Sequence, residues 1–122
     1  MKYVLLLNNE SRDWDAWRAL SPEEAQAARE EEIPKWDGLW AWMEQQGIKA
    51  EGLELGDPAK ARVVRVQNGE AIVSDGPFAE TKELLGGYFV ADCKDLDQAI
   101  EFAERVPVAS KGSVEIRPLV TH

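Results

Sequence analysis

The sequence predicts an α+β fold, a ferredoxin-like sandwich of the βαβ(hairpin)βαβ type with helices on one side of a mainly antiparallel sheet. Three observations predict it. The chain has 122 residues, of which 44% are hydrophobic, and this suits one domain with a buried core. Segments with strand and helix patterns follow one another as two βαβ units. Between the units, Asn68-Gly69 marks an inserted hairpin. We therefore expect a single domain over residues 1–122.

The first predicted elements are a strand and a long helix. Residues 2–8 form a nearly continuous apolar run, which is typical of a central strand. Residues 9–20 predict a loop or a short helical turn. The segment Ser21-Pro22-Glu23-Glu24 predicts a helix start, because the serine accepts an unpaired amide, the proline has no amide to leave unpaired, and Glu24 completes a capping box. Gly47 is the expected C-terminal stop.

The long helix contains an apolar stripe and a proline. Pro34 removes a backbone hydrogen bond, which predicts a kink or a break near residues 32–33. The predicted stripe, at spacings of three, four and three residues, is Ile33, Trp36, Trp40 and Met43.

The chain contains five tryptophans. We expect Trp36 and Trp40 to pack on the sheet as core, since an aromatic stripe at helical spacing is usually core. Trp14, Trp17 and Trp42 would line a pocket or a dimer surface wherever they are partly exposed.

The second half of the chain predicts five strands and one helix. Asn68-Gly69 is the strongest hairpin signal, because both residues tolerate a positive φ. Asp95 and Gln98 predict a capping box at the helix start. The predicted buried face of this helix is Leu96, Ala99, Ile100 and Ala103. The predicted strands are residues 50–55, 62–67, 70–74, 87–93 and 113–120, and the predicted helix is residues 95–106.

A sheet with helices on one side leaves its other side uncovered. If Tyr3, Leu5 or Phe89 lies on that side, a partner must bury it, and a second copy of the chain is the simplest partner. We therefore expect a homodimer.

Composition and charge exclude several kinds of partner. The formal net charge of −9 repels phosphate groups, so we expect no nucleic acid and no anionic membrane as partner. No apolar run is long enough to span a membrane, and no signal peptide is recognisable, which predicts a cytoplasmic protein. The single cysteine, Cys93, is predicted to be a buried small hydrophobe. No cofactor or metal motif is present, and we expect neither.

The segment that begins with Asp75-Gly76-Pro77-Phe78 predicts a rigid corner, because the proline fixes its own φ and restricts the glycine before it. Phe78 would anchor the corner and leave the Asp75 carboxylate in a fixed direction at the mouth of the sheet. Two alternatives remain open: Asp75 only caps the turn by accepting backbone amides, or it binds a metal together with Glu80 and Glu83.

Residues 75–83, followed by Leu85-Gly86-Gly87-Tyr88, closely resemble the signature of the YCII-related family, in its DGPF-domain branch. The resemblance extends from residues 2–6 to residues 112–118. It implies a dimeric α/β-barrel, in which two ferredoxin-like sheets face each other, and a cleft near the motif aspartate. YCII-type relatives have been proposed to use a His-Asp pair, and Asp75 matches the acid. The only histidine here is His122, at the end of the chain, so the resemblance leaves Asp75 as a lone acid or base, a ligand-fixing group or a structural group.

Two functions are consistent with these observations. The first is a YCII-like homodimer that binds a small organic molecule, with an acid as one candidate, and that uses Asp75 as the catalytic acid or base. Its candidate ligand-binding residues are Arg62, Arg65, Phe78 and Tyr88. The second is a non-catalytic regulatory or protein-interaction module, which for DGPF-branch relatives suggests a link to a sigma-factor system.

Overall fold

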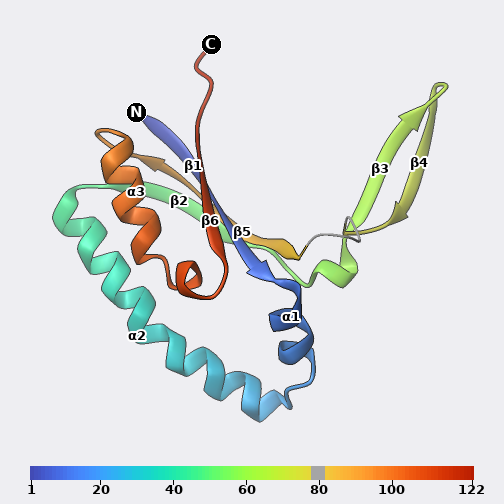
Figure 1. The fold of residues 1–122 in the computed structure, drawn as a ribbon, viewed down its shortest axis with the longest axis horizontal. Coiled ribbons are helices and arrows are strands. Elements are labelled where there is room, and N and C mark those ends of the chain that lie inside the picture. The colour runs from blue at the N-terminus through green and yellow to red at the C-terminus, as the bar shows by residue number, and fades with distance from the viewer. Residues whose placement is uncertain (78–81) are drawn as a thin grey trace.

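A four-stranded antiparallel sheet forms the centre of the fold (Figure 1). The computed structural model describes residues 1–77 and 82–122. The strand order is β2-β5-β1-β6, and each neighbouring pair is antiparallel. Two interleaved βαβ units produce this order, so the predicted ferredoxin-like α+β fold is confirmed. The strands are β1 (Lys2–Glu10), β2 (Lys49–Glu54), β5 (Glu83–Asp92) and β6 (Ser113–Pro118).

Two long helices cover one face of this sheet (Figure 1). Alternate residues of β1 point toward them, because successive strand residues face opposite sides. A single buried cluster joins Leu5 of β1, Leu39 of α2 and Phe102 of α3. The helices of the described chain are α1 (Ser11–Arg18), α2 (Pro22–Gln46) and α3 (Leu96–Arg105), with short 3-10 turns η1 (Pro58–Lys60) and η2 (Pro107–Ser110).

The predicted start and end of α2 are confirmed. The Glu24 amide donates to Ser21 Oγ at 3.1 Å, and the Ser21 amide donates to the Glu24 carboxylate at 3.0 Å. Gly47 ends the helix with a φ of 68°. The break that Pro34 predicts does not occur, and α2 continues through it as one helix. Both Pro34 and Glu30 are exposed, so water can satisfy the carbonyl that the proline leaves without a donor.

The predicted apolar stripe of α2 is partly wrong. Met43 is buried and Trp36 packs against the core, but Ile33 and Trp40 are exposed. The helix buries Leu39 and Trp42 instead. The reason is that only the C-terminal half of α2 contributes to the core, so Ile33 lies beyond the sheet.

The aromatic side chains of the two helices meet over β5. Phe102 lies 5.3 Å from Phe89 and 6.3 Å from Trp42, measured between ring centres. Trp42 therefore belongs to the core, with the guanidinium of Arg105 4.6 Å from its ring centre. Trp14 and Trp17 of α1 are half-buried.

Helix α3 differs from its prediction in its buried face and in part of its cap. The Asp95 side chain accepts the Gln98 amide at 2.8 Å as predicted, but the Gln98 side chain accepts the Lys94 amide at 2.9 Å instead of the Asp95 amide. Leu96 and Ile100 are exposed. The buried residues are Gln98, Ala99, Phe102 and Ala103, a face rotated away from the predicted stripe.

The predicted hairpin is confirmed as a separate two-stranded sheet of β3 (Arg62–Gln67) and β4 (Glu70–Asp75). Asn68 and Gly69 have φ values of 52° and 78°, as a two-residue turn of this kind requires. Figure 1 shows the hairpin projecting from the body of the molecule.

The sheet face opposite the helices also carries apolar side chains. In the antiparallel ladders, Val4 lies opposite Val90, and Leu6 and Leu53 flank Tyr88. These five residues form what we call the open face, and Leu53 is its most exposed member at 68%. Tyr3, Leu5 and Phe89, which the sequence left open as residues of this side, lie buried in the core on the helix side.

No helix in the part of the chain that the structure describes combines the length and the apolarity needed to cross a bilayer. Cys93 is buried as predicted, and its burial raises the pKa of the thiol.

Candidate functional site

Asp75 and Arg62 form an ion pair at the base of the hairpin. They are directly opposite residues of β4 and β3, and Arg62 Nε lies 3.5 Å from Asp75 Oδ1. The Asp75 side chain is 91% exposed. The carboxylate is therefore not enclosed, and the amide of residue 78, which the turn-cap alternative would use, lies outside the described residues. The Gly76 amide that follows donates to the Ala61 carbonyl at 3.0 Å.

The other predicted ligand residues lie apart from this pair. Arg65 is opposite Ile72 and therefore faces the other side of the hairpin from Arg62. Tyr88 belongs to the four-stranded sheet, where it lies on the open face beside Leu6. Phe78 lies outside the described residues, as does Glu80 of the metal alternative.

A polar groove of about 830 Å³ lies where β1 ends and β5 begins. The amide of Ser11 donates to the Lys82 carbonyl at 2.8 Å and joins the two segments. The described residues that line the groove are Asn8, Glu10, Ser11, Arg12, Lys82 and Glu83. The motif therefore contributes Lys82 and Glu83 to a groove, although the sequence favours solvated roles for both.

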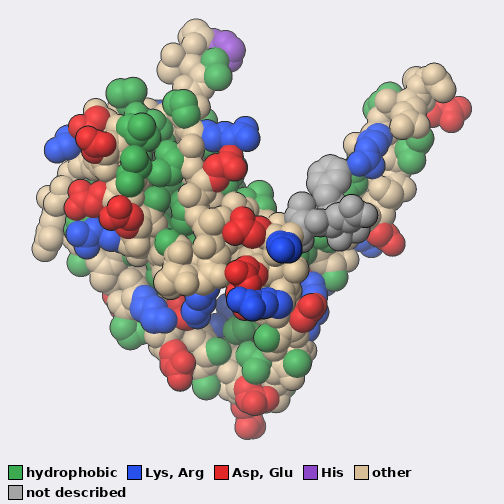
Figure 2. Space-filling model, in the orientation of Figure 1, with side chains coloured by type: hydrophobic (Ala, Val, Ile, Leu, Met, Phe, Trp, Pro, Cys, Tyr) green, Lys and Arg blue, Asp and Glu red, His purple; other side chains and the backbone are tan. Residues whose placement is uncertain are grey.

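Charges of both signs lie close together in this groove, which we call the polar groove. Glu10 and Glu83 are directly opposite in the β1–β5 ladder, where two negative charges repel each other. Arg12 forms an ion pair with Glu10, and the Ser113 hydroxyl donates to Glu83 at 2.9 Å, so each carboxylate has its own partner. Lys82 forms no ion pair within the described residues. Figure 2 shows acidic and basic side chains next to one another over the middle of the molecule.

A second, more apolar groove of about 410 Å³ lies beside the turn η1. Pro77 of the motif lines it, and Asp57 and Lys60 are its charged members. The remaining lining residues are Leu55, Gly56, Pro58, Ala61, Leu84 and Leu85. Described residues of the motif thus contribute to two grooves of different polarity.

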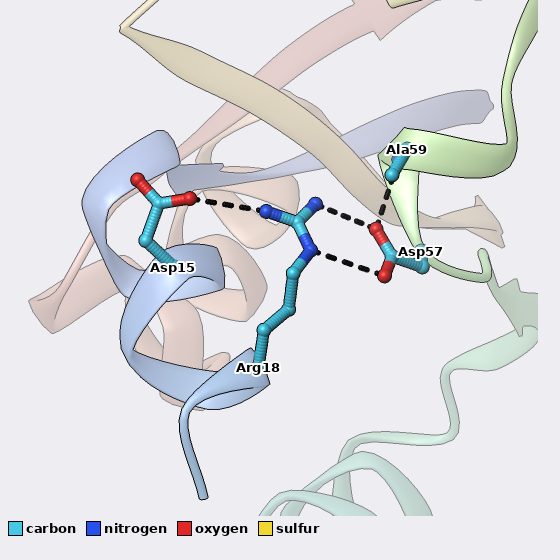
Figure 3. Close-up of polar contacts among 4 residues, drawn as sticks. All are labelled: Asp15, Arg18, Asp57 and Ala59. Carbon is cyan, nitrogen blue, oxygen red and sulfur yellow. Dashed lines mark hydrogen bonds and ion pairs between the residues drawn. The ribbon is translucent and has the colours of Figure 1, made fainter.

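Asp57 is held by Arg18 across the edge of this second groove (Figure 3). Arg18 Nε and Nη2 donate to the two Asp57 oxygens at 3.1 and 2.6 Å, and the Ala59 amide donates to Asp57 at 2.8 Å. These donors lower the pKa of Asp57 to about 2, with Arg18 as the largest cause, and the Asp57 carboxylate raises the pKa of Arg18. Arg18 also bonds Asp15 at 3.1 Å. The pair fixes α1 to the segment that leads into the hairpin.

The described residues offer no site for a metal. No group of three or more His, Cys, Asp or Glu side chains is arranged to hold a metal ion in residues 1–77 and 82–122. Of the three acids in the metal alternative, Glu83 accepts the Ser113 hydroxyl and Asp75 pairs with Arg62.

Comparison with known proteins gives one family and one relative. The family model described as "YCII-related domain" matches residues 1–121. "Uncharacterized protein R00369" of Rhizobium meliloti (strain 1021) is 50% identical over 64 residues, which is 51% of this chain and 52% of that protein. The chain therefore spans about half the length of the curated relative that it matches.

Proposed function

The chain belongs to the YCII-related domain family, and we propose that it is a homodimer that binds a small organic acid beside its Asp75–Glu83 segment. The observation that carries the proposal is the polar groove, about 830 Å³ in volume, which is large enough for a small organic molecule.

The charge pattern of the polar groove supports an acidic ligand. Lys82 contributes an ammonium group that no described carboxylate neutralises, whereas the carboxylates of Glu10 and Glu83 already have partners. An anionic group bound at Lys82 would gain a charge-assisted hydrogen bond. The hydroxyl of Ser11 and the amide of Asn8 add donors for the rest of the ligand.

Asp75 is the group that we propose for proton transfer. Its exposed carboxylate is paired with Arg62 and open to water. A general base must lie within hydrogen-bond reach of the proton that it removes, and an active site must exclude water from the reacting group. The proposal therefore requires that the bound ligand or a second chain cover Asp75.

The homodimer is proposed to form through the open face of the sheet. Val4, Leu6, Leu53, Tyr88 and Val90 form a contiguous apolar surface opposite the helices. Surfaces of this kind are usually buried by a partner. The second candidate function, a non-catalytic protein-interaction module, is supported by exposed apolar side chains on the hairpin, among them Val66.

Ligand binding is tested by thermal shift with a panel of aliphatic and aromatic mono- and dicarboxylates. We expect at least one to raise the melting temperature of the wild type, because a ligand that binds only the folded state stabilises it. Lys82→Ala should abolish this rise. Lys49→Ala, the same change on an exposed strand residue outside the groove, should preserve it. Equal rises in both variants would remove the polar groove from the proposal.

A further inference from the structure

The hairpin has one apolar face and one mixed face. Across its ladder Val64 lies opposite Val73, and Val66 lies opposite Ala71, so these four side chains share a face. We call it the valine face. The other face carries Arg65 opposite Ile72 and Gln67 opposite Glu70.

The valine face is open to solvent in a single chain. Val64, Val66 and Val73 are 61%, 71% and 62% exposed. Figures 1 and 2 show the hairpin standing away from the body, which leaves this face without cover from the chain's own helices. An isolated two-stranded ribbon is at best marginally stable in water, and exposed apolar patches mark interaction surfaces.

We propose that the valine face packs against a second copy of this chain, and that this contact covers the Arg62–Asp75 pair. The proposal rests on the homodimer of the proposed function and adds the element that clasps the partner and completes the site. The pair lies on the same face as the valines, because Arg62 and Asp75 are opposite each other two residues before Val64 and two residues after Val73.

Charge favours a second copy on this surface. The chain carries a net charge of −9, so two copies repel each other over most of their surface. The hairpin strands contain two arginines and two carboxylates, Arg62, Arg65, Glu70 and Asp75, and are neutral overall. The repulsion between two chains is therefore weakest where the hairpin makes the contact.

The available area also suits a two-fold dimer. One face of a ribbon of six-residue strands measures roughly 20 by 10 Å. In a two-fold dimer each chain buries its own hairpin face and an equal area under the partner's hairpin, which is on the order of 400 Å² per chain. This is about half of the roughly 800 Å² that a standard interface buries on each partner, and the open face of the sheet is available for the rest.

Covering the pair changes what Asp75 can do. In a single chain its carboxylate faces water, whereas the partner would exclude water from it and leave Arg62 as its neighbour. Each site would then be built from the hairpin base of one chain and the surface of the other, and would be incomplete in a monomer.

Two adjacent residues of β4 allow a matched test, because Val73 lies on the valine face and Ser74 lies on the other. Sedimentation of the wild type should give twice 13.7 kDa. Val73→Glu places a carboxylate in the interface and should raise the dimer dissociation constant by about tenfold or more. Ser74→Glu adds the same charge on the other face and should leave it within about twofold. Far-UV circular dichroism checks that both variants are folded, and Val64→Lys repeats the test with the opposite charge.

The covered pair is tested by carbodiimide labelling of carboxylates, read by mass spectrometry. Asp75 should be protected in the wild-type dimer and labelled in folded Val73→Glu. A wild type that stays monomeric overturns the proposed contact between the valine face and a second copy, and so does a Val73→Glu dimer as tight as the wild type. The valine face would then be a surface for a different protein. Equal labelling of Asp75 in dimer and monomer overturns the composite site. None of these results bears on carboxylate binding at Lys82, which the thermal-shift experiment tests separately.

Discussion

Arg18 Nη2 lies 2.6 Å from Asp57 Oδ1, although the two residues are 39 positions apart in the sequence. The contact joins α1 to the turn that opens the hairpin segment, and the second bond from Arg18 Nε makes it bidentate. Bidentate arginine–carboxylate pairs have a defined geometry, so this pair fixes the position of one side of the apolar groove.

The Asp57 pair predicts a loss of stability in acid. Its pKa falls from 3.8 in the unfolded chain to about 2 in the fold, so its contribution is complete above pH 3.8 and disappears as the pH falls toward 2. Asp57→Asn should lower the melting temperature slightly at neutral pH, since the pair is exposed to solvent, and the difference from the wild type should shrink in this acidic window.

The observed face of α3 predicts which of its apolar residues stabilise the protein. Phe102 is fully buried between Trp42 and Phe89, so Phe102→Ala should lower the free energy of unfolding by about 3–5 kcal/mol. Ile100 is 40% exposed, and Ile100→Ala should cost clearly less, about 1 kcal/mol. Denaturant unfolding measures both losses. Equal losses would mean that Ile100 belongs to the buried face of α3, as the sequence predicts.

Two glycines should respond to alanine in opposite ways. A Cβ on Gly112 would collide with the Asn8 carbonyl, so Gly112→Ala should lower the free energy of unfolding by about 1–3 kcal/mol. Gly38 lies inside α2 with open space around it, and Gly38→Ala should raise the free energy by about 0.5–1 kcal/mol because alanine favours the helix. A stabilised Gly112→Ala variant would contradict the close contact between β1 and the start of β6.

Asp75 should contribute little to folding. In a single chain its ion pair with Arg62 is exposed and of a kind that adds little stability, so Asp75→Asn, made in the monomeric Val73→Glu variant, should leave the melting temperature nearly unchanged. The turn-cap alternative makes the opposite prediction, because the loss of a capping carboxylate destabilises a turn. A melting curve of this variant, run beside Asp92→Asn at the far end of β5, decides between them.

Features specified by neighbouring residues could be predicted from the sequence. The capping box at Ser21 and Glu24, the stop at Gly47 and the turn at Asn68-Gly69 each depend on residues within a few positions, and each is confirmed. The sheet follows from the order of the elements, because short connections between two βαβ units allow few arrangements.

Features specified by packing could not be predicted from the sequence. The buried faces of α2 and α3 depend on how far each helix overlaps the sheet, and hydrophobic spacing alone does not encode this overlap. The prediction that Ile33 and Ile100 belong to the core is therefore wrong. The separation of Arg62 from Arg65 follows from strand parity and was available in the sequence. The polar groove could not be predicted from the sequence, because Glu10 and Glu83 meet only once β1 and β5 are paired.

The burial of Cys93 has a practical consequence for spectroscopy. A thiol that is 1% exposed, with a raised pKa, presents almost no thiolate to a maleimide dye. A cysteine introduced at the Asn68-Gly69 tip would therefore take up a single fluorophore or spin label without removal of the native thiol. Distances between two such probes would report directly how far apart the tips of neighbouring molecules are held.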